Sequence, residues 1–447
     1  MPLVATPIQL PADAVELRAG DVDGDGRDEL VVVSRAPRPG QPEPVKLTIL
    51  SFGADGAPGA RREIDLGRKA MLWDIDQGLW AVDSEGLLRL DPAGNTRIAR
   101  FPTPLAGLGP TTPRWAPIAH QLDGVGPPEL IAWSAGRYLA FRVDGSTFGS
   151  IPAAAEGELG VDWSTGGAST RSTLSPPPLA VADLDADGKS DLLLPSGNRI
   201  AAFYTGEAVG ARASTLTLPI DLEPREENPK QGEVRTRIAG VWLDDVDGDH
   251  RADLAVQRIV LNGSWFGATA DLCLAKGRGD GFGALQVRST GAAAFGVELL
   301  DQDGDGDKDF VAPLVDIGVG ALARALVARS ARVDLSVFRM DAGAYGPAIS
   351  LRVLGFPLEH PDRFQAQMRL DVDGDAVPDL VTNEGEDKVR IYRGKAGGLE
   401  STPAFELAIV VPAGDETLFV HDLTGDGKAE IVVWGPGSTS ASVLRVR

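Results

Sequence analysis

The stretch Asp21-Val-Asp-Gly-Asp-Gly-Arg-Asp-Glu29, followed at once by the apolar run Leu30-Val-Val-Val33, recurs in variant form along the chain. The other five well-kept copies begin at Asp183, Asp245, Asp301, Asp371 and Asp422. Most copies also have an apolar stretch before them, such as Leu179-Ala-Val-Ala182. The repeated unit is therefore predicted to be a strand, an acidic loop and a second strand.

Two further copies are degenerate. Trp73-Asp-Ile-Asp-Gln-Gly78 keeps two acidic positions and then shortens, whereas Gln121-Leu-Asp-Gly-Val-Gly-Pro-Pro-Glu129 keeps only positions three and nine. With these copies included, repeat units start near residues 21, 74, 121, 183, 245, 301, 371 and 422. The average of about 56 residues per unit suits a four-stranded blade with insertions.

A second hairpin with a Gly-rich turn follows the acidic loops, as in Gly279-Asp-Gly-Phe-Gly283. The last unit ends at Ser442-Val-Leu-Arg-Val446, one strand short, and Val4-Ala-Thr-Pro-Ile-Gln-Leu10 can supply the missing strand. Such a closure removes the open sheet edges. We predict an all-β fold, an eight-bladed β-propeller of four-stranded antiparallel blades, with seven blades as the alternative. The chain is predicted to be one domain, 1–447, with units near 11–67, 68–101, 115–152, 177–219, 236–289, 294–353, 364–408 and 415–447 plus 3–10.

The Asp-x-Asp-x-Asp-Gly loops, together with turns such as Phe52-Gly53 and Gly56-Ala-Pro58, resemble the FG-GAP (VCBS) repeats of integrin α-chain propellers and many bacterial surface proteins. The resemblance covers nearly the whole chain and is weakest in the second and third units. It implies a calcium-bearing propeller that acts as an extracellular adhesion or ligand-binding module.

The loop residues themselves point to calcium, a hard cation that takes six to eight oxygen ligands. Alternating positions one, three and five place side chains inside a tight turn, position seven can offer its carbonyl, and position nine returns a carboxylate from the second strand. Magnesium fits less well, because it prefers a smaller shell rich in water. We therefore predict up to six Ca²⁺, with Thr424 weakening the last site. The predicted ligands are Asp21, Asp23, Asp25, Arg27 and Glu29; Asp183, Asp185, Asp187, Lys189 and Asp191; Asp245, Asp247, Asp249, Arg251 and Asp253; Asp301, Asp303, Asp305, Asp307 and Asp309; Asp371, Asp373, Asp375, Val377 and Asp379; and Asp422, Thr424, Asp426, Lys428 and Glu430.

Charge and composition exclude several other functions. With 64 acidic and 43 basic residues the formal net charge is −21, which argues against nucleic-acid binding and against docking on an anionic membrane. One cysteine, Cys273, excludes an internal disulfide framework. No signal peptide is expected from the first residues. Because the loops need abundant calcium, we nevertheless predict an extracellular, cell-surface or periplasmic location, and a monomeric domain.

Long insertions fall in the connections at the end of the blades opposite the acidic loops. They are Arg35–Pro44, Phe101–Arg114, Ala153–Pro178, Ile220–Glu233, Ile259–Thr269 and Val315–Arg332. Decorated loops on a rigid scaffold commonly carry binding sites, so a protein or carbohydrate ligand is predicted to dock there. Within the last insertion, Gly318–Arg329 is either a short amphipathic helix or a packing insertion, and we favour the insertion.

Aromatic and histidine residues give weaker signals. Trp163 and Trp265 lie in insertions and either stack on a sugar or cover the rim, with the rim favoured. Five tryptophans in strand patterns are predicted to be core: Trp73, Trp80, Trp133, Trp242 and Trp434. The four histidines show no catalytic spacing. A non-enzymatic binding module is therefore predicted, with a carbohydrate-active enzyme of the polysaccharide lyase type and a purely structural domain as alternatives.

Overall fold

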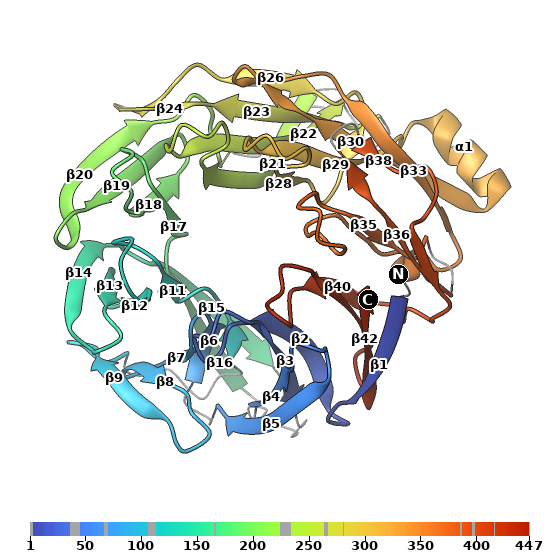
Figure 1. Ribbon diagram of the computed structural model, residues 1–447. Helices are drawn as coiled ribbons and strands as arrows, with labels where there is room; N and C mark the ends of the chain where they lie inside the picture. The colour runs from blue at the N-terminus through green and yellow to red at the C-terminus, as the bar shows by residue number, and fades with distance from the viewer. Residues whose placement is uncertain are drawn as a thin grey trace.

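The computed structural model of this protein describes residues 3–35, 45–66, 70–105, 113–164, 167–223, 234–262, 267–279, 281–384, 387–395, 398–414 and 416–446. Within these ranges the regular structure is almost entirely β-strand, apart from helix α1 (Val319–Ala328) and the 3₁₀ turn η1 (Pro361–Arg363). The strands form antiparallel sheets that follow one another around a ring (Figure 1). No helix in the described part of the chain is long and apolar enough to cross a membrane.

The sheets succeed one another in chain order. The first contains β2 (Ala14–Gly20), β3 (Glu29–Arg35), β4 (Val45–Phe52) and β5 (Pro58–Asp65). The second contains β6 (Ala70–Ile75), β7 (Leu79–Asp83), β8 (Gly86–Arg89) and β9 (Thr96–Arg100). The third contains β11 (Ala119–His120), β12 (Glu129–Ser134), β13 (Arg137–Phe141) and β14 (Thr147–Pro152). The fourth contains β17 (Ala180–Ala182), β18 (Asp191–Ser196), β19 (Arg199–Thr205) and β20 (Val209–Thr217), and the pair Gly149↔Val209 joins it to the third.

The second half of the ring repeats this order. The fifth sheet contains β21 (Val234–Asp244), β22 (Asp253–Asn262), β23 (Thr269–Ala275) and β26 (Gln286–Ser289). The sixth contains β27 (Ala293–Ala294), β28 (Glu298–Leu300), β29 (Asp309–Val315), β30 (Ser330–Phe338) and β33 (Ile349–Pro357). The seventh contains β34 (Ala366–Gln367), β35 (Leu380–Thr382), β36 (Val389–Tyr392) and β39 (Phe405–Leu407). The closing sheet contains β40 (Leu418–His421), β41 (Glu430–Val433), β42 (Ser440–Val446) and β1 (Leu3–Gln9).

The N-terminal strand completes the closing sheet, as predicted. Strand β1 pairs antiparallel with β42 in an unbroken register from Leu3↔Val446 to Gln9↔Ser440. The two ends of the chain therefore lie side by side in the ring (Figure 1). This pairing covers the edge that β42 would otherwise expose.

Buried apolar clusters fill the junction between each sheet and the next, which explains why the second strands are apolar on both faces. Val31 and Val33 of β3, for example, pack with Trp73 and Leu79 of the second sheet, while Val32 faces the closing sheet. Equivalent clusters fill the other junctions. A strand buried on both faces reads as a continuous apolar run instead of an alternating one.

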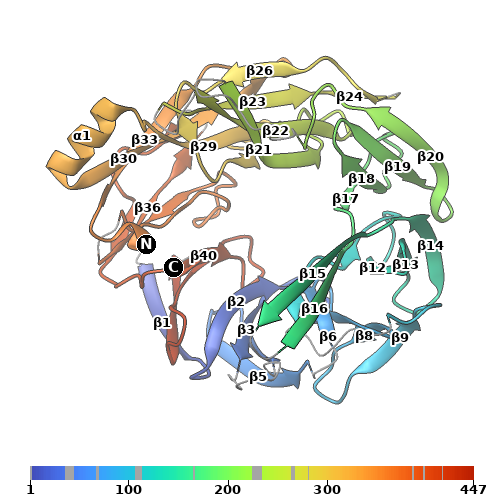
Figure 2. The ribbon, with the colours of Figure 1, turned by 180° about the vertical axis from the view of Figure 1, so that it is seen from behind.

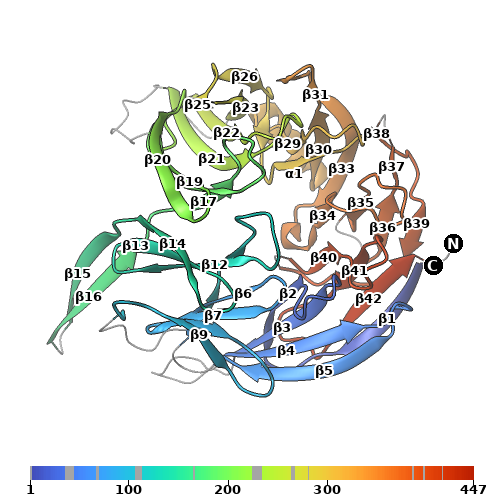
Figure 3. The same ribbon diagram turned by 60° about the vertical axis from the view of Figure 1, so that its left-hand side comes forward.

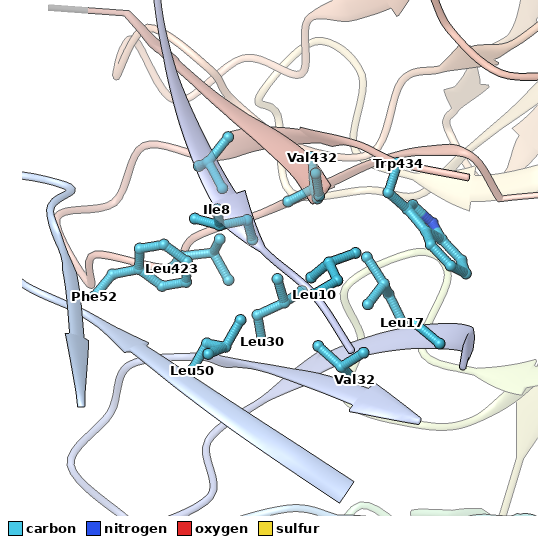
Figure 4. Packing of buried hydrophobic residues seen from close by; sticks show 13 residues of the cluster. Ile8, Leu10, Leu17, Leu30, Val32, Leu50, Phe52, Leu423, Val432 and Trp434 are labelled. Atoms are coloured by element: carbon cyan, nitrogen blue, oxygen red, sulfur yellow. The ribbon is translucent and has the colours of Figure 1, made fainter. Parts of the chain in front are cut away.

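Figure 4 shows the cluster at the junction where the ring closes. Ile8 and Leu10 from the N-terminal segment meet Leu30 and Val32 of the first sheet and Trp434 of the closing sheet. Each such buried side chain contributes about 1.5–3 kcal/mol relative to an exposed one. Closure therefore rests on a hydrophobic core as well as on the strand pairing.

Several small elements lie outside the four-stranded pattern. The Gly-rich turns form two-stranded hairpins, β24 (Gly277–Arg278) with β25 (Gly281–Phe282), β31 (Met340–Asp341) with β32 (Ala344–Tyr345), and β37 (Gly394–Lys395) with β38 (Gly398–Leu399). Strand β10 (Arg114–Trp115) pairs parallel with β6. The insertion 153–178 contains a further hairpin, β15 (Glu156–Ser164) with β16 (Gly167–Ser175), which stands out from the ring (Figures 2 and 3).

The segment Gly318–Arg329 corrects the sequence-based preference for a packing insertion. It forms helix α1, and none of its residues is buried. The run is rich in Ala and Leu, which favour helix, and Arg329 ends it in the left-handed conformation at φ 53°. The helix lies on the outside of the ring (Figure 1).

The tryptophans predicted to be core divide into two groups. Trp73, Trp80 and Trp434 are buried, whereas Trp133 and Trp242 are partly buried against neighbouring clusters. Trp265 and the side chain of Trp163 lie outside the described residues.

Candidate metal centres

The acidic loops join the first strand of a sheet to the second, and their backbone follows one scheme. In the loop 371–379, Asp371 at position one accepts hydrogen bonds from the N–H groups of Gly374 (2.6 Å) and Ala376 (2.6 Å). Gly374 and Ala376 have φ values of 92° and 67°, which is the left-handed region that glycine adopts most easily. Position five also supports the turn, because Asp375 accepts from the N–H of Val377 at 3.0 Å.

The carboxylate at position nine is buried and ties the loop to the rest of its sheet. In the loop 245–253, one oxygen of Asp253 accepts from the N–H of Val246 (3.3 Å) and the other from the N–H of Gly277 (2.6 Å). Burial nevertheless raises the pKa of Asp253 to about 6, because these hydrogen bonds only partly offset desolvation. Burial in the same way raises the pKa of the other position-nine carboxyls, to about 6 for Asp191, Asp309 and Asp379 and to about 7 for Glu430.

The two oxygens of the position-three carboxylate have different surroundings. In the loop 245–253, Oδ2 of Asp247 lies 2.5 Å from the ammonium nitrogen of Lys276, while Oδ1 is buried without a hydrogen-bond partner. Three more loops repeat this arrangement, with the pairs Asp185–Arg212 (2.6 Å), Asp303–Arg339 (3.3 Å) and Asp373–Arg393. A buried carboxylate oxygen without a partner is costly, and a bound cation would satisfy it.

Acidic oxygens gather into clusters at five of the loops. In each cluster three carboxylates bring one oxygen apiece to within 4.8 Å of the others. The clusters are Asp21, Asp23 and Glu29; Asp183, Asp185 and Asp191; Asp245, Asp247 and Asp253; Asp301, Asp303 and Asp305; and Asp371, Asp373 and Asp379. A set of hard oxygens on a flexible loop, with an unpartnered buried oxygen among them, fits calcium.

The structure thus brings together most of the predicted carboxylates at positions one, three and nine. Among those at position five only Asp305 belongs to a cluster, and all six accept the N–H of position seven: Asp25, Asp187, Asp249, Asp305, Asp375 and Asp426. Metal ligation by the carbonyls of position seven stays a prediction, for Arg27, Lys189, Arg251, Asp307, Val377 and Lys428.

The loop 422–430 differs from the other five. Its position-three residue, Thr424, donates its hydroxyl to Glu430 at 3.1 Å. Arg445 from β42 contacts two of the three acidic side chains, with Nε 3.2 Å from Glu430 and Nη2 paired with Asp426, while Asp422 accepts the N–H groups of Gly425 and Gly427. The structure describes this loop in full, and it is not among the five at which three acidic oxygens gather.

The two degenerate loops satisfy their polar groups within the chain. Asp74, which is buried, accepts from the N–H groups of Ile118 (2.6 Å) and Ala119 (3.0 Å) in the next sheet. In the loop 121–129 the amide of Gln121 donates to the carbonyl of Gly126 at 2.8 Å, and Arg142 pairs with Asp123 at 3.1 Å. These loops keep the turn without the acidic cluster.

Sequence reasoning missed the cations that accompany the acidic loops. Lys276, Arg339 and Arg393 each come directly after the last residue of a third strand, so their common spacing could have revealed them. Arg62 and Arg212 come from fourth strands instead, where no local pattern marks them. These cations reduce the repulsion between the carboxylates before any metal binds.

Neighbouring acidic loops are also hydrogen-bonded to one another. The N–H of Ala252 donates to the carbonyl of Asp183 (2.7 Å), that of Lys308 to Val246 (2.7 Å), and that of Ala429 to Asp371 (2.8 Å). In these pairs position eight of one loop reaches position one or two of the loop before it. A conformational change in one acidic loop can therefore alter the loop to which it is hydrogen-bonded.

Comparison with known proteins identifies the repeat type. The FG-GAP-like repeat model matches residues 371–433, which confirms the predicted resemblance in this part of the chain. No curated protein matches the sequence. Similar solved structures include a lectin from Agrocybe aegerita that recognises non-reducing terminal N-acetylglucosamine, with 13% identity, 97% of this chain and 86% of that chain covered, and a TM-score of 0.43.

Two further similar structures have other functions. BBS1N in complex with ARL6DN has 11% identity and a TM-score of 0.40, with 98% of this chain and 94% of that chain covered. The dihydro-heme d1 dehydrogenase NirN has 14% identity and a TM-score of 0.39, with 96% of this chain and 73% of that chain covered. At TM-scores below 0.5, no ligand or activity is carried over from these proteins.

Proposed function

We propose that this chain, in which FG-GAP-like repeats are recognised at residues 371–433, is an eight-bladed, calcium-stabilised β-propeller that works outside the cytoplasm as a non-enzymatic binding module. The ligand would be a protein or a carbohydrate, and it would dock at the end of the sheets opposite the acidic loops. The blade count is supported by the apolar clusters, which link each sheet to the next and the last sheet to the first.

The observation that carries the calcium proposal is the unpartnered, buried oxygen of the position-three carboxylate. It recurs at Asp185, Asp247, Asp303 and Asp373, and each of these residues belongs to a three-carboxylate cluster. One buried oxygen without a hydrogen-bond partner would be a local exception. Four such oxygens at equivalent positions of the repeat support a bound cation in each of these loops. Calcium would also reduce the net charge of −21, and loops of this kind suit the millimolar calcium found outside cells.

The proposed docking end of the sheets is the one that carries additional surface elements. The acidic loops occupy one end of the sheets, whereas the hairpin β15–β16 and helix α1 arise from connections at the other end. Helix α1 exposes Val319, Leu326 and Val327, which are 73%, 63% and 89% exposed. Exposed apolar side chains on a rigid scaffold are a common feature of binding surfaces.

A shortened hairpin tests this assignment. Glu156 and Ser175 are register partners, so replacing 157–174 by Asn-Gly restores a two-residue turn without disturbing β14 or β17. On a glycan array in millimolar calcium, we expect the wild type to give a specific hit that the shortened variant loses. Arg212→Leu, at the acidic-loop end, is the matched control and should keep the hit.

Two other results would contradict the proposal in different ways. Binding that survives the hairpin replacement and a triple Val319→Ser, Leu326→Ser, Val327→Ser variant would place the ligand elsewhere. Release of unsaturated sugars from polysaccharides, followed by ultraviolet absorbance, would identify the chain as a lyase.

A further inference from the structure

We propose that in the loop 422–430 the guanidinium of Arg445 takes the place of a metal ion, and that it thereby locks the closing sheet to the first sheet. The ring would then be sealed by a permanent cation that belongs to the chain, while the other acidic loops depend on calcium. The lock is independent of whether those loops bind calcium, so the two proposals can fail separately.

Two of the three acidic side chains of this loop are already paired with Arg445, and the third, Asp422, accepts backbone N–H groups. The Nε of Arg445 lies 3.2 Å from Oε1 of Glu430, and its Nη2 pairs with Oδ2 of Asp426. Thr424 supplies a hydroxyl where the other loops have a third carboxylate, and that hydroxyl donates to Glu430 at 3.1 Å. The guanidinium thus makes a charge-assisted hydrogen bond to Asp426 and an ion pair with Glu430.

No orphaned oxygen remains here for a metal ion. Position-three oxygens are buried and unpartnered at Asp185, Asp247, Asp303 and Asp373, whereas none of the side-chain atoms of the loop 422–430, all of which are described, is in that condition. The loop 422–430 therefore lacks the unpartnered oxygen found in four of the other loops and also the three-carboxylate cluster that the loop 21–29 keeps.

The remaining guanidinium nitrogen of Arg445, Nη1, contacts the first sheet. It donates to the carbonyl of Ala54 at 2.9 Å, in the turn between β4 and β5. Gly56 of the same turn packs on the arginine stem, since a Cβ at Gly56 would lie 3.4 Å from Cδ and Nη1 of Arg445. One side chain thus holds an acidic loop of the closing sheet and a turn of the first sheet together.

This junction lacks a link that other junctions have. Backbone hydrogen bonds from Ala252, Lys308 and Ala429 tie their loops to the preceding loops. No such bond joins the loop 422–430 to the loop 21–29, both of which the structure describes in full. Side chains make the connection instead, through Arg445 and through the pair of His421 and Asp28 at 3.2 Å.

The position of the junction explains why a permanent lock is useful. Elsewhere in the ring each whole sheet follows the previous one along the chain, whereas the closing sheet combines strands from both ends of the chain. It is held to the first sheet through β1, Arg445, the His421–Asp28 pair, the hydrogen bond from the N–H of Gly437 to the carbonyl of Ala14, and the buried cluster of Figure 4. If closure depended on a dissociable ion, loss of calcium would free β1. The guanidinium of Arg445 is covalently part of β42, the strand that pairs with β1, so it does not dissociate.

The first experiment counts bound calcium after dialysis, by mass spectrometry, in two matched variants. Asp305→Asn and Asp426→Asn both change position five, in the loops 301–309 and 422–430, and only Asp305 belongs to a three-carboxylate cluster. We expect Asp305→Asn to lose one calcium per chain and Asp426→Asn to lose none. Loss of one calcium in Asp426→Asn would overturn the proposal. A wild type without calcium would refute the proposed calcium function and leave the lock to the second experiment.

The second experiment measures amide hydrogen exchange of β1 in excess EDTA. Arg445→Leu removes two hydrogen bonds and the ion pair with Glu430, so exchange over Leu3–Gln9 should accelerate about tenfold or more relative to wild type. Arg212→Leu is the matched control: Arg212 pairs with Asp185 and stacks on Tyr204 within one sheet, and exchange of β1 should stay within about twofold of wild type.

A second variant that preserves the positive charge keeps the test valid if Arg445→Leu does not fold. Arg445→Lys keeps the cation but loses the fork, so exchange of β1 should fall between that of wild type and Arg445→Leu. Equal exchange of β1 in the wild type and both Arg445 variants would overturn the lock.

Discussion

The loops 245–253 and 422–430 share a backbone turn but differ in what holds their charges. In both, position one accepts at least one backbone N–H group and position nine is buried. In the first, Asp247 keeps a buried oxygen without a partner while Lys276 holds its other oxygen. In the second, Arg445 contacts the carboxylates of Asp426 and Glu430. The backbone turn alone therefore does not identify a metal site. The residue at position three, and the carboxylates that a nearby cation already contacts, distinguish the two loops.

The largest expected effect comes from removing calcium altogether. Excess EDTA should lower the melting temperature by about 10 °C relative to millimolar calcium, because several sites each lose the stabilisation that a bound ligand provides. Hydrogen exchange should then accelerate strongly over 246–252 and by less than about twofold over 423–429. Equal acceleration in both loops would show that they do not differ in the way their side chains indicate.

The pH dependence of stability should change sign with calcium. Burial raises the pKa of Asp253 to about 6, so the native state holds its proton more tightly than the unfolded chain does. Stability in EDTA should therefore fall as the pH rises from about 4 through 6, with a melting temperature roughly 5 °C higher at about pH 5 than at pH 7.5. In calcium the order should reverse, because protons compete with the ion.

Thermal melts in the two buffers check this prediction, and Glu430→Gln separates the contributions of the loops. Burial raises the pKa of Glu430 to about 7, so its substitution should remove part of the pH dependence in both buffers alike. A change confined to the calcium buffer would mean that Glu430 is a metal ligand after all.

A single substitution at position three should have a smaller, calcium-specific effect. Asp247→Asn removes the charge of the orphaned oxygen, so the protein should lose one bound calcium and about 3 °C of melting temperature in calcium, with little change in EDTA. Asp123→Asn is the control, since Asp123 occupies the same position and also pairs with an arginine, but in a degenerate loop. Equal effects of calcium on both variants would contradict the assignment.

The smallest expected effect concerns the competition between the built-in cation and the metal. Lys276→Gln removes a positive charge next to Asp247, so calcium affinity of the loop 245–253 should rise about threefold, as is typical for a partly exposed pair. Calcium titration measures the change, and Arg142→Gln in the loop 121–129 should leave calcium binding unaltered. A weaker affinity in Lys276→Gln would mean that Lys276 supports the site.

Much of the fold could be predicted from local pattern. The alternation of Asp with Gly, followed by runs such as Leu30–Val33, specifies a turn and a buried strand because both depend on neighbouring residues. The N-terminal strand was also predictable, since the last unit is one strand short. Helix α1 was not, because its apolar spacing fits a buried insertion as well as an exposed helix, and only packing distinguishes the two.

The alternation of acidic residues with glycine places the loops, because a turn depends on neighbouring residues. The number of strands likewise shows that the first strand must complete the last sheet. Which loops keep an unpartnered oxygen, and which loop is occupied by an arginine, follows only from the folded chain. Lys276 and Arg445 contact their carboxylates across strands, so the charge balance of a loop depends on side chains distant in sequence.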